Sequence, residues 1–185
     1  MCGIVGFVGQ GNTKDILLSG LSRLEYRGYD SAGIALHSHP FTVVKSVGKL
    51  EELKKKVDAS KECESSCSMG IGHTRWATHG KADEKNSHPH LSMNKEVVLV
   101  HNGIIENFAE LRTELLAEGV EFQSQTDTEV AAALIASSYN KLGTGNLTEA
   151  VRVASNRMEG AFTILAVHAD HPDQVVATRR NSPLV

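Results

Sequence analysis

The chain has 185 residues, of which 41% are hydrophobic and 22% are charged, a composition typical of one folded domain rather than a disordered segment. Its formal net charge of -3 offers no basic field to a phosphate backbone, so we expect no nucleic-acid partner. The longest apolar run, residues 130–136, is far shorter than the roughly 18 residues of a membrane span, so we expect no membrane partner. The start lacks the basic segment of a secretory signal, and three cysteines are an odd number for a disulfide framework, so we expect a cytoplasmic protein.

The first third of the chain alternates short strand and helix patterns. The predicted elements are a strand at 2–9, a helix at 13–27, strands at 32–37 and 41–47, and a helix at about 50–58. Thr13 is the expected N-cap of the first helix, and Gly28 follows its end. The charged stretch 58–68 is predicted to be a surface loop.

The remainder of the chain combines strands with a group of helices. The predicted elements are strands at 70–75 and 96–101, helices after Asn107 to about Gly119, at about 128–141 and at about 148–158, and strands at 161–168 and 174–178. Asn107 and Glu110 form the expected capping pair of the first of these helices. Strands outnumber helices and several are joined as hairpins, which predicts an α+β fold with helices covering sheets. Because the chain stops at 182–185 without a polar tail, we expect it to be C-terminally truncated.

Cys2 becomes the first residue if Met1 is removed. It then carries a thiol and a free α-amine, whose pKa in model compounds is about 7.7–8.0, so the amine can take a proton near neutral pH. Because a thiol attacks as its thiolate, one residue would supply both nucleophile and base. The ordinary alternative is a small buried cysteine at the start of a strand.

Residues 72–80, Gly-His-Thr-Arg-Trp-Ala-Thr-His-Gly, concentrate polar side chains at the end of a predicted strand. Arg75 can bind a carboxylate through two parallel hydrogen bonds, and Trp76 can form a pocket wall. Thr78 and His79 can donate hydrogen bonds to a ligand. A surface loop with ordinary polar residues is the alternative, although this density of functional side chains is unusual for one.

Three further positions suit a site for an amino acid. Asn102 offers a side-chain amide and Gly103 a closely approachable backbone N–H, which together suit an oxyanion hole, although an Asn-Gly turn is the alternative. Asp127 can hold an α-ammonium group or simply cap a helix. Near the first helix, Arg27 and Asp30 flank Gly28, where they can form a local ion pair or fix the loop around the first strand.

A metal site is the competing interpretation of the cysteines and histidines. Its candidate ligands are Cys63, Cys67, His88 and His90. Their spacing matches no zinc motif, and the sequence has no HExxH segment. We therefore expect no metal and no cofactor.

Taken together, the motifs resemble the class II glutamine amidotransferases, which are N-terminal-nucleophile enzymes, over essentially the whole chain. The segments that carry the resemblance are CGIVG, YRGYDSAG, HTRWATHG, HPH, VHNGI and TDTE, in this order. Residues 26–31 and 76–79 resemble the branch that aminates fructose 6-phosphate, with amidophosphoribosyltransferase as the alternative branch. The resemblance implies a four-layer αββα sandwich of two mainly antiparallel sheets, with residues 1–185 as the glutaminase domain.

The resemblance also implies a role for each candidate residue. Cys2 attacks the side-chain amide of glutamine, and Asn102 and Gly103 stabilise the oxyanion. Arg75 holds the α-carboxylate of glutamine and Asp127 its α-ammonium group. Trp76, Thr78 and His79 shape the pocket, and His88 neighbours it. Arg27 and Gly28 support the site.

The implied reaction releases glutamate and ammonia through a thioester on Cys2, and it requires the removal of Met1. In the family enzyme the ammonia passes to sugar-isomerase domains, which are absent from this chain and make glucosamine 6-phosphate from fructose 6-phosphate. The full-length enzyme is expected to be a homo-oligomer. A glutamine-binding module without catalysis is the alternative from a different functional class.

Overall fold

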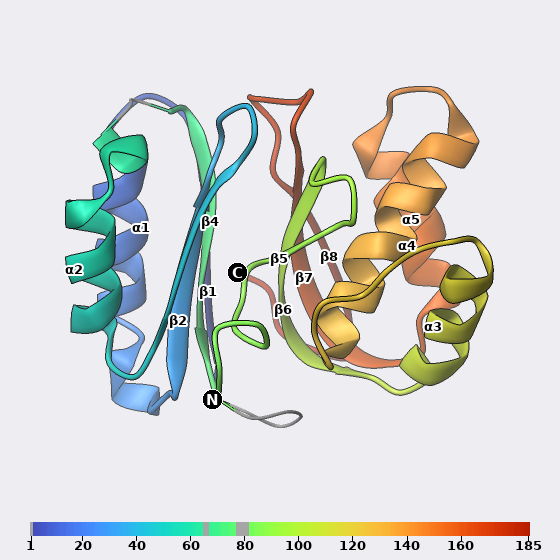
Figure 1. The fold of residues 1–185 in the computed structure, drawn as a ribbon, viewed down its shortest axis with the longest axis horizontal. Helices are drawn as coiled ribbons and strands as arrows, with labels where there is room; N and C mark the ends of the chain where they lie inside the picture. The colour runs from blue at the N-terminus through green and yellow to red at the C-terminus, as the bar shows by residue number, and fades with distance from the viewer. Residues whose placement is uncertain (1, 65–66, 77–81) are drawn as a thin grey trace.

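The computed structural model describes residues 2–64, 67–76 and 82–185, which form four layers in the order α, β, β, α. In Figure 1 each of the two sheets has helices on its outer face. The two sheets pack face to face between the helical layers. The predicted four-layer αββα sandwich is therefore confirmed.

The first sheet has the strand order β1-β4-β2-β3, with every neighbouring pair antiparallel. Its strands are β1 (Gly3–Val8), β2 (Ser31–Leu36), β3 (Thr42–Val47) and β4 (Met69–Arg75). The helices that cover it are α1 (Thr13–Ser22) and α2 (Leu50–Ala59). Since β1 is an edge strand paired only with β4 in this sheet, the start of the chain lies against the end of β4.

The second sheet has the order β5-β6-β7-β8 and is also antiparallel. Its strands are β5 (His90–Leu91), β6 (Val97–Ile105), β7 (Gly160–His168) and β8 (Val176–Arg180). The helices that cover it are α3 (Phe108–Ala117), α4 (Asp127–Leu142) and α5 (Leu147–Arg157). Its central strands β6 and β7 form the longest strand pairing among the described residues, and β6 contributes to the site described below.

The alternation of side chains along each strand divides the core into layers. On β6, Val97 and Leu99 pack with the helices, whereas Val98 and Val100 face the other sheet. Likewise Ile34 of β2 packs with α1 and α2, while its neighbour Ala35 faces the second sheet. β2 and β6 thus pack against helices on one face and against the opposite sheet on the other.

The N-terminal helix and the segment after α2 differ from the prediction. α1 begins after Asn12, whose side chain accepts a hydrogen bond from the N–H of Asp15, so Thr13 is not the cap. It ends at Ser22, and a separate 3₁₀ turn, η1 (Glu25–Arg27), precedes Gly28. The segment 58–68 is not simply a surface loop, because it contains a 3₁₀ turn, η2 (Lys61–Glu64), whose Cys63 is buried among the helices.

Two differences concern the second sheet. Asn107 precedes α3, but its side chain bonds the carbonyl of Arg157 and the N–H of Glu159 instead of capping the helix. β6 continues to Ile105, so the Asn-Gly pair lies inside a strand and forms no turn. Within the described ranges, no helix is long and apolar enough to cross a bilayer.

Candidate active site

A cavity of about 380 Å³ opens between the two sheets, where the N-terminus, β4, β6 and the start of α4 meet. The sequence-predicted residues that line it are Cys2, Arg75, Trp76, His88, Asn102, Gly103 and Asp127. Such a volume suits a small polar metabolite. The structure thus brings together seven candidates that are far apart in the sequence, while Thr78 and His79 lie outside the described residues.

Cys2 is held at the cavity by the pairing of β1 with β4. Gly3 pairs with Thr74, and the N–H of Gly3 donates a hydrogen bond to the Oγ1 of Thr74 over 3.0 Å. The Sγ of Cys2 lies 3.1 Å from the backbone N of Trp76, whose N–H donates to it. The sulfur is half-buried and faces the cavity rather than the core. This placement is that of an accessible thiol, not of a core cysteine.

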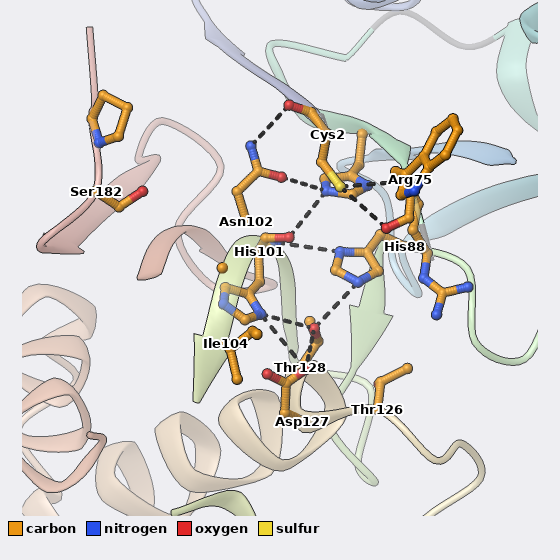
Figure 2. Close-up of a pocket in the computed structure, with 14 residues that line it drawn as sticks. Cys2, Arg75, His88, His101, Asn102, Ile104, Thr126, Asp127, Thr128 and Ser182 are labelled. Atoms are coloured by element: carbon orange, nitrogen blue, oxygen red, sulfur yellow. Dashed lines mark hydrogen bonds and ion pairs between the residues drawn. The ribbon is translucent and has the colours of Figure 1, made fainter. Parts of the chain in front are cut away.

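Asn102 and Gly103 belong to β6, and Asn102 lies beside Cys2. The Nδ2 of Asn102 donates to the carbonyl oxygen of Cys2 over 3.3 Å, and Figure 2 shows the two side by side. Gly103 has a φ of 123°, and a Cβ there would lie 2.1 Å from the carbonyl oxygen of Ala161 on β7. Only glycine fits that position, so the backbone next to the amide of Asn102 stays uncovered by a side chain.

Arg75 is the last residue of β4, Trp76 follows it, and both line the cavity. The guanidinium of Arg75 is buried and lies 3.9 Å from the Oδ1 of Asp30, so Asp30 pairs with Arg75. Trp76 is 55% exposed, and its indole packs on Gly28, where a Cβ would lie 3.0 Å from Cζ3. Gly28 therefore supports the tryptophan directly. The side chain of Arg27 lies outside the described part of the structure.

Asp127 is the first residue of α4. The preceding Thr126 is the actual N-cap, since its hydroxyl accepts the N–H of Glu129. The Oδ2 of Asp127 accepts the N–H of Ile105 over 2.9 Å, which aims the carboxylate at the cavity. In the described ranges no lysine or arginine forms an ion pair with it; the Nδ1 of His101 lies 3.8 Å from its Oδ1, and that ring would be an ion-pair partner only if it were protonated. The carboxylate can therefore receive a cationic group from a ligand.

Buried histidines cluster at the cavity, where His73, His88 and His101 contribute to its lining and His90 lies behind them against His88. Burial lowers the pKa of His73 to about 3 and lowers the pKa values of His88 and His90 well below 6.5. Burial also lowers the pKa of His101, against the opposite effect of nearby Asp127. These rings are therefore neutral at physiological pH, and they act as hydrogen-bonding groups rather than as charges.

The hydroxyl of Thr128 connects two of these rings. It lies 3.2 Å from the Nε2 of His88 and 3.0 Å from the Nδ1 of His101. The Nδ1 of His88 accepts the backbone N–H of His101 over 3.3 Å. Both ring nitrogens of His88 are therefore engaged within the protein, so this ring forms a wall of the cavity.

The sequence analysis assigned no role to His73, His101 or Thr128, although all three line the cavity. One signal was present for His73. It lies two residues before Arg75 in a predicted strand, and alternate residues of a strand face the same side. Thr128 had no such signal, because its importance comes from the partners that the fold brings to it.

The residues of the metal hypothesis are separated by the first sheet. Cys63 and Cys67 pack with α1 and α2, whereas His88 lines the cavity between the sheets. Among the described residues, no group of three histidine, cysteine or acidic side chains is arranged so that it could hold a metal ion.

The fold and the site together define an N-terminal-nucleophile amidotransferase. Residues 37–181 match the family described as "Glutamine amidotransferase domain", and the chain belongs to that family. Its whole length is 54% identical to proteins of Corynebacterium glutamicum and Streptomyces coelicolor that are both named glutamine--fructose-6-phosphate aminotransferase [isomerizing]. The chain spans 30% of the length of these relatives.

Solved structures confirm the fold independently. The glutamine phosphoribosylpyrophosphate amidotransferase from B. subtilis, complexed with ADP and GMP, matches 91% of this chain and 35% of its own with a TM-score of 0.73 at 28% identity. An allosteric regulatory enzyme of purine biosynthesis matches 91% of this chain and 36% of its own with a TM-score of 0.74 at 29% identity. The chain is thus more similar in sequence to the proteins named glutamine--fructose-6-phosphate aminotransferase than to these two solved structures, and the former are the branch that the sequence motifs indicated.

Proposed function

We propose that this chain hydrolyses the side-chain amide of glutamine to glutamate and ammonia, with Cys2 as the nucleophile. The observation that carries the proposal is the placement of the Cys2 thiol, the amide of Asn102 and the uncovered backbone at Gly103 around one cavity. An acyl transfer needs these three elements within reach of one carbonyl group.

The proposed reaction begins when the α-amine of Cys2, free after removal of Met1, takes the thiol proton. The sulfur then attacks the amide carbon of glutamine, and the C=O electron pair moves to oxygen. The protonated amine gives its proton to the leaving nitrogen, which departs as ammonia and leaves a thioester on Cys2. Water adds to the thioester carbon with the amine again as base, the C–S bond breaks to release glutamate, and the sulfur takes back the proton from the amine.

The oxyanion is stabilised by the Nδ2–H of Asn102 and the backbone N–H of Gly103. Removing one oxyanion donor lowers kcat by about 10²- to 10³-fold in other acyl-transfer enzymes. The donors act in a partly closed cavity with neutral histidines beneath it. Because those rings add no positive charge at neutral pH, the oxyanion depends on these directed hydrogen bonds.

The remaining candidates bind the α-groups of glutamine and shape the pocket. The buried guanidinium of Arg75 binds the α-carboxylate, and the carboxylate of Asp127 binds the α-ammonium group. Trp76 forms a wall of the pocket and His88 backs it, and we assign Thr78 and His79, which lie outside the described residues, a role in shaping the pocket. Gly28 supports Trp76, and we assign Arg27 a supporting role at the first strand.

For the whole protein, we propose that residues 1–185 are the glutaminase domain and that its ammonia passes to a sugar-isomerase domain. The acceptor is fructose 6-phosphate and the product glucosamine 6-phosphate, in keeping with the name of the relatives. We further propose that the full-length enzyme is a cytoplasmic homo-oligomer.

The test is glutamate release from glutamine by this chain, with the loss of Met1 verified by intact mass. Cys2→Ala is expected to reduce the rate to background. Cys67→Ala is the matched control, because this partly buried cysteine packs on the helical side of the first sheet and is expected to retain the parental rate. Equal rates for the parent and Cys2→Ala would refute the proposal.

A further inference from the structure

The side-chain amide of Asn102 contacts His73, a fully buried residue of β4. The Nε2 of His73 lies 3.0 Å from the carbonyl oxygen of His101 and 2.8 Å from the Oδ1 of Asn102. A backbone carbonyl can only accept a hydrogen bond, so Nε2 must carry the proton. That same N–H therefore faces the oxygen end of the Asn102 amide.

The other ring nitrogen supports the same tautomer. The Nδ1 of His73 is buried and has no hydrogen-bond partner among the described residues. If the neutral ring carried its proton on Nδ1 instead, that N–H would be a buried donor without an acceptor. The unprotonated Nε2 would then face two oxygen atoms to which it could not donate, so both ring nitrogens would be in unfavourable surroundings. The ring also stacks on His88, with centroids 4.1 Å apart and an interplanar angle of 21°, so it cannot rotate freely.

The orientation matters because an asparagine amide has two nearly isosteric ends. Its terminal torsion is broad and two-fold, so the side chain alone does not select one end. With Oδ1 held by His73, Nδ2 points to Cys2, where it already donates to the carbonyl oxygen. A reversed amide would present an oxygen to the developing oxyanion and would repel it.

We propose that His73 is a positioning residue for glutamine hydrolysis, whose Nε2–H locks the Asn102 amide with its N–H₂ end toward the reacting carbonyl. The inference rests on the proposed function, and it adds a residue that acts through the amide of Asn102. Since an oxyanion donor acts in the transition state, loss of the lock lowers kcat more than it raises KM.

The kinetic test compares two amides at position 73. Glutamine places its terminal N–H₂ near the position of Nε2, whereas asparagine reaches only about as far as Nδ1. His73→Asn is expected to lower kcat by about 10- to 100-fold with KM changed less than about threefold, and His73→Gln to recover most of that loss. Equal losses in the two variants would overturn the proposal, because a space-filling role does not distinguish them in this way.

A double-mutant cycle tests the route through Asn102. In an Asn102→Ala background, His73→Asn is expected to cause no further loss of kcat, because the group that it positions is gone. Full additivity of the two losses would overturn the proposal. Thermal unfolding of each variant checks that the comparison is between folded proteins.

A third measurement does not depend on activity. Nitrogen-15 NMR of the His73 ring in the Cys2→Ala chain is expected to find Nε2 protonated and Nδ1 bare from pH 7 to pH 5. A proton on Nδ1 would overturn the proposal even if the parent chain released no glutamate. Failure of the proposed function appears separately, as absence of glutamate release from the parent with Met1 removed.

Discussion

The backbone N–H of Trp76 donates a hydrogen bond to the Sγ of Cys2 over 3.1 Å, which ties the nucleophile to the end of β4. The same register brings Gly3 opposite Thr74, one residue before Arg75. The end of β4 therefore positions both the sulfur of Cys2 and Arg75, the residue proposed to bind the α-carboxylate. A shift in the pairing of β1 with β4 would displace the thiol from every other proposed ligand contact.

The first prediction concerns the N-terminus. A chain that keeps Met1 is expected to lose glutamate release to the level of Cys2→Ala, because the nitrogen of Cys2 is then an amide and cannot act as base. Glutamine binding is expected to persist, which can be measured by calorimetry on samples of known intact mass. Such a chain would behave as the binding module considered as the alternative function.

The control for this prediction is enzymatic removal of the methionine from the same preparation. Activity is expected to appear in proportion to the processed fraction. Hydrolysis by a fully unprocessed sample at the processed rate would contradict the proposed base.

The second prediction concerns Asp127. Asp127→Asn keeps an oxygen for the N–H of Ile105 but removes the negative charge. Because a charge-assisted hydrogen bond contributes about 1.5–3 kcal/mol, KM for glutamine is expected to rise by about 10- to 100-fold with a smaller change in kcat. Steady-state kinetics of glutamate formation measure this change.

A substrate analogue is the control for Asp127. Glutaramate has the amide and the carboxylate of glutamine but lacks the α-ammonium group. The parent and Asp127→Asn are expected to hydrolyse it with similar kcat/KM. An equal penalty for both substrates would show that Asp127 does not act through the ammonium group.

The layered fold could be predicted from the sequence because of particular strands. Residues 97–100 are apolar on both faces, a pattern that requires cover on both sides. The strand conformation of Asn102 and Gly103 could not be predicted in this way. Their local preference is a turn, but pairing with Thr163 and Phe162 far along the chain keeps them in β6. Tertiary pairing overrides the local preference, and no short window of sequence contains it.

The candidate site divides in the same way. Cys2, Arg75 and Asp127 could be predicted because each carries a reactive or charged group in a recognisable motif. The roles of His73 and Thr128 depend on partners from other elements, namely the amide of Asn102 and the rings of two histidines. Those partners become known only when β4, β6 and α4 are placed together.

The third prediction compares two glycines with positive φ. Gly103→Ala is expected to lower the free energy of unfolding by at least about 3 kcal/mol, because the strained φ adds to a clash with the backbone of Ala161. Gly119 also has a positive φ, 86°, but a Cβ there would meet nothing within 4 Å, so the expected cost of Gly119→Ala is about 1 kcal/mol. Urea unfolding at pH 7 measures both, and equal costs would contradict the close approach of β7 at Gly103.

The last prediction concerns acid stability. The unfolded chain protonates its histidines near pH 6.5, whereas burial holds the pKa of folded His73 at about 3 and that of His90 well below 6.5. Below pH 6.5 the unfolded state therefore binds more protons, so the free energy of unfolding falls as the pH drops from about 6.5 toward 3.

Each such histidine contributes a slope of up to about 1.4 kcal/mol per pH unit, with the full contribution to stability present only above pH 6.5. His90→Gln is expected to make the dependence shallower by up to that amount, because it removes one group that is buried in its neutral form. His39→Gln is the matched control, since His39 is exposed in the turn between β2 and β3. Urea unfolding between pH 7 and pH 5 measures the slopes; if His39→Gln flattened the curve as much as His90→Gln, burial of the ring would not be the cause.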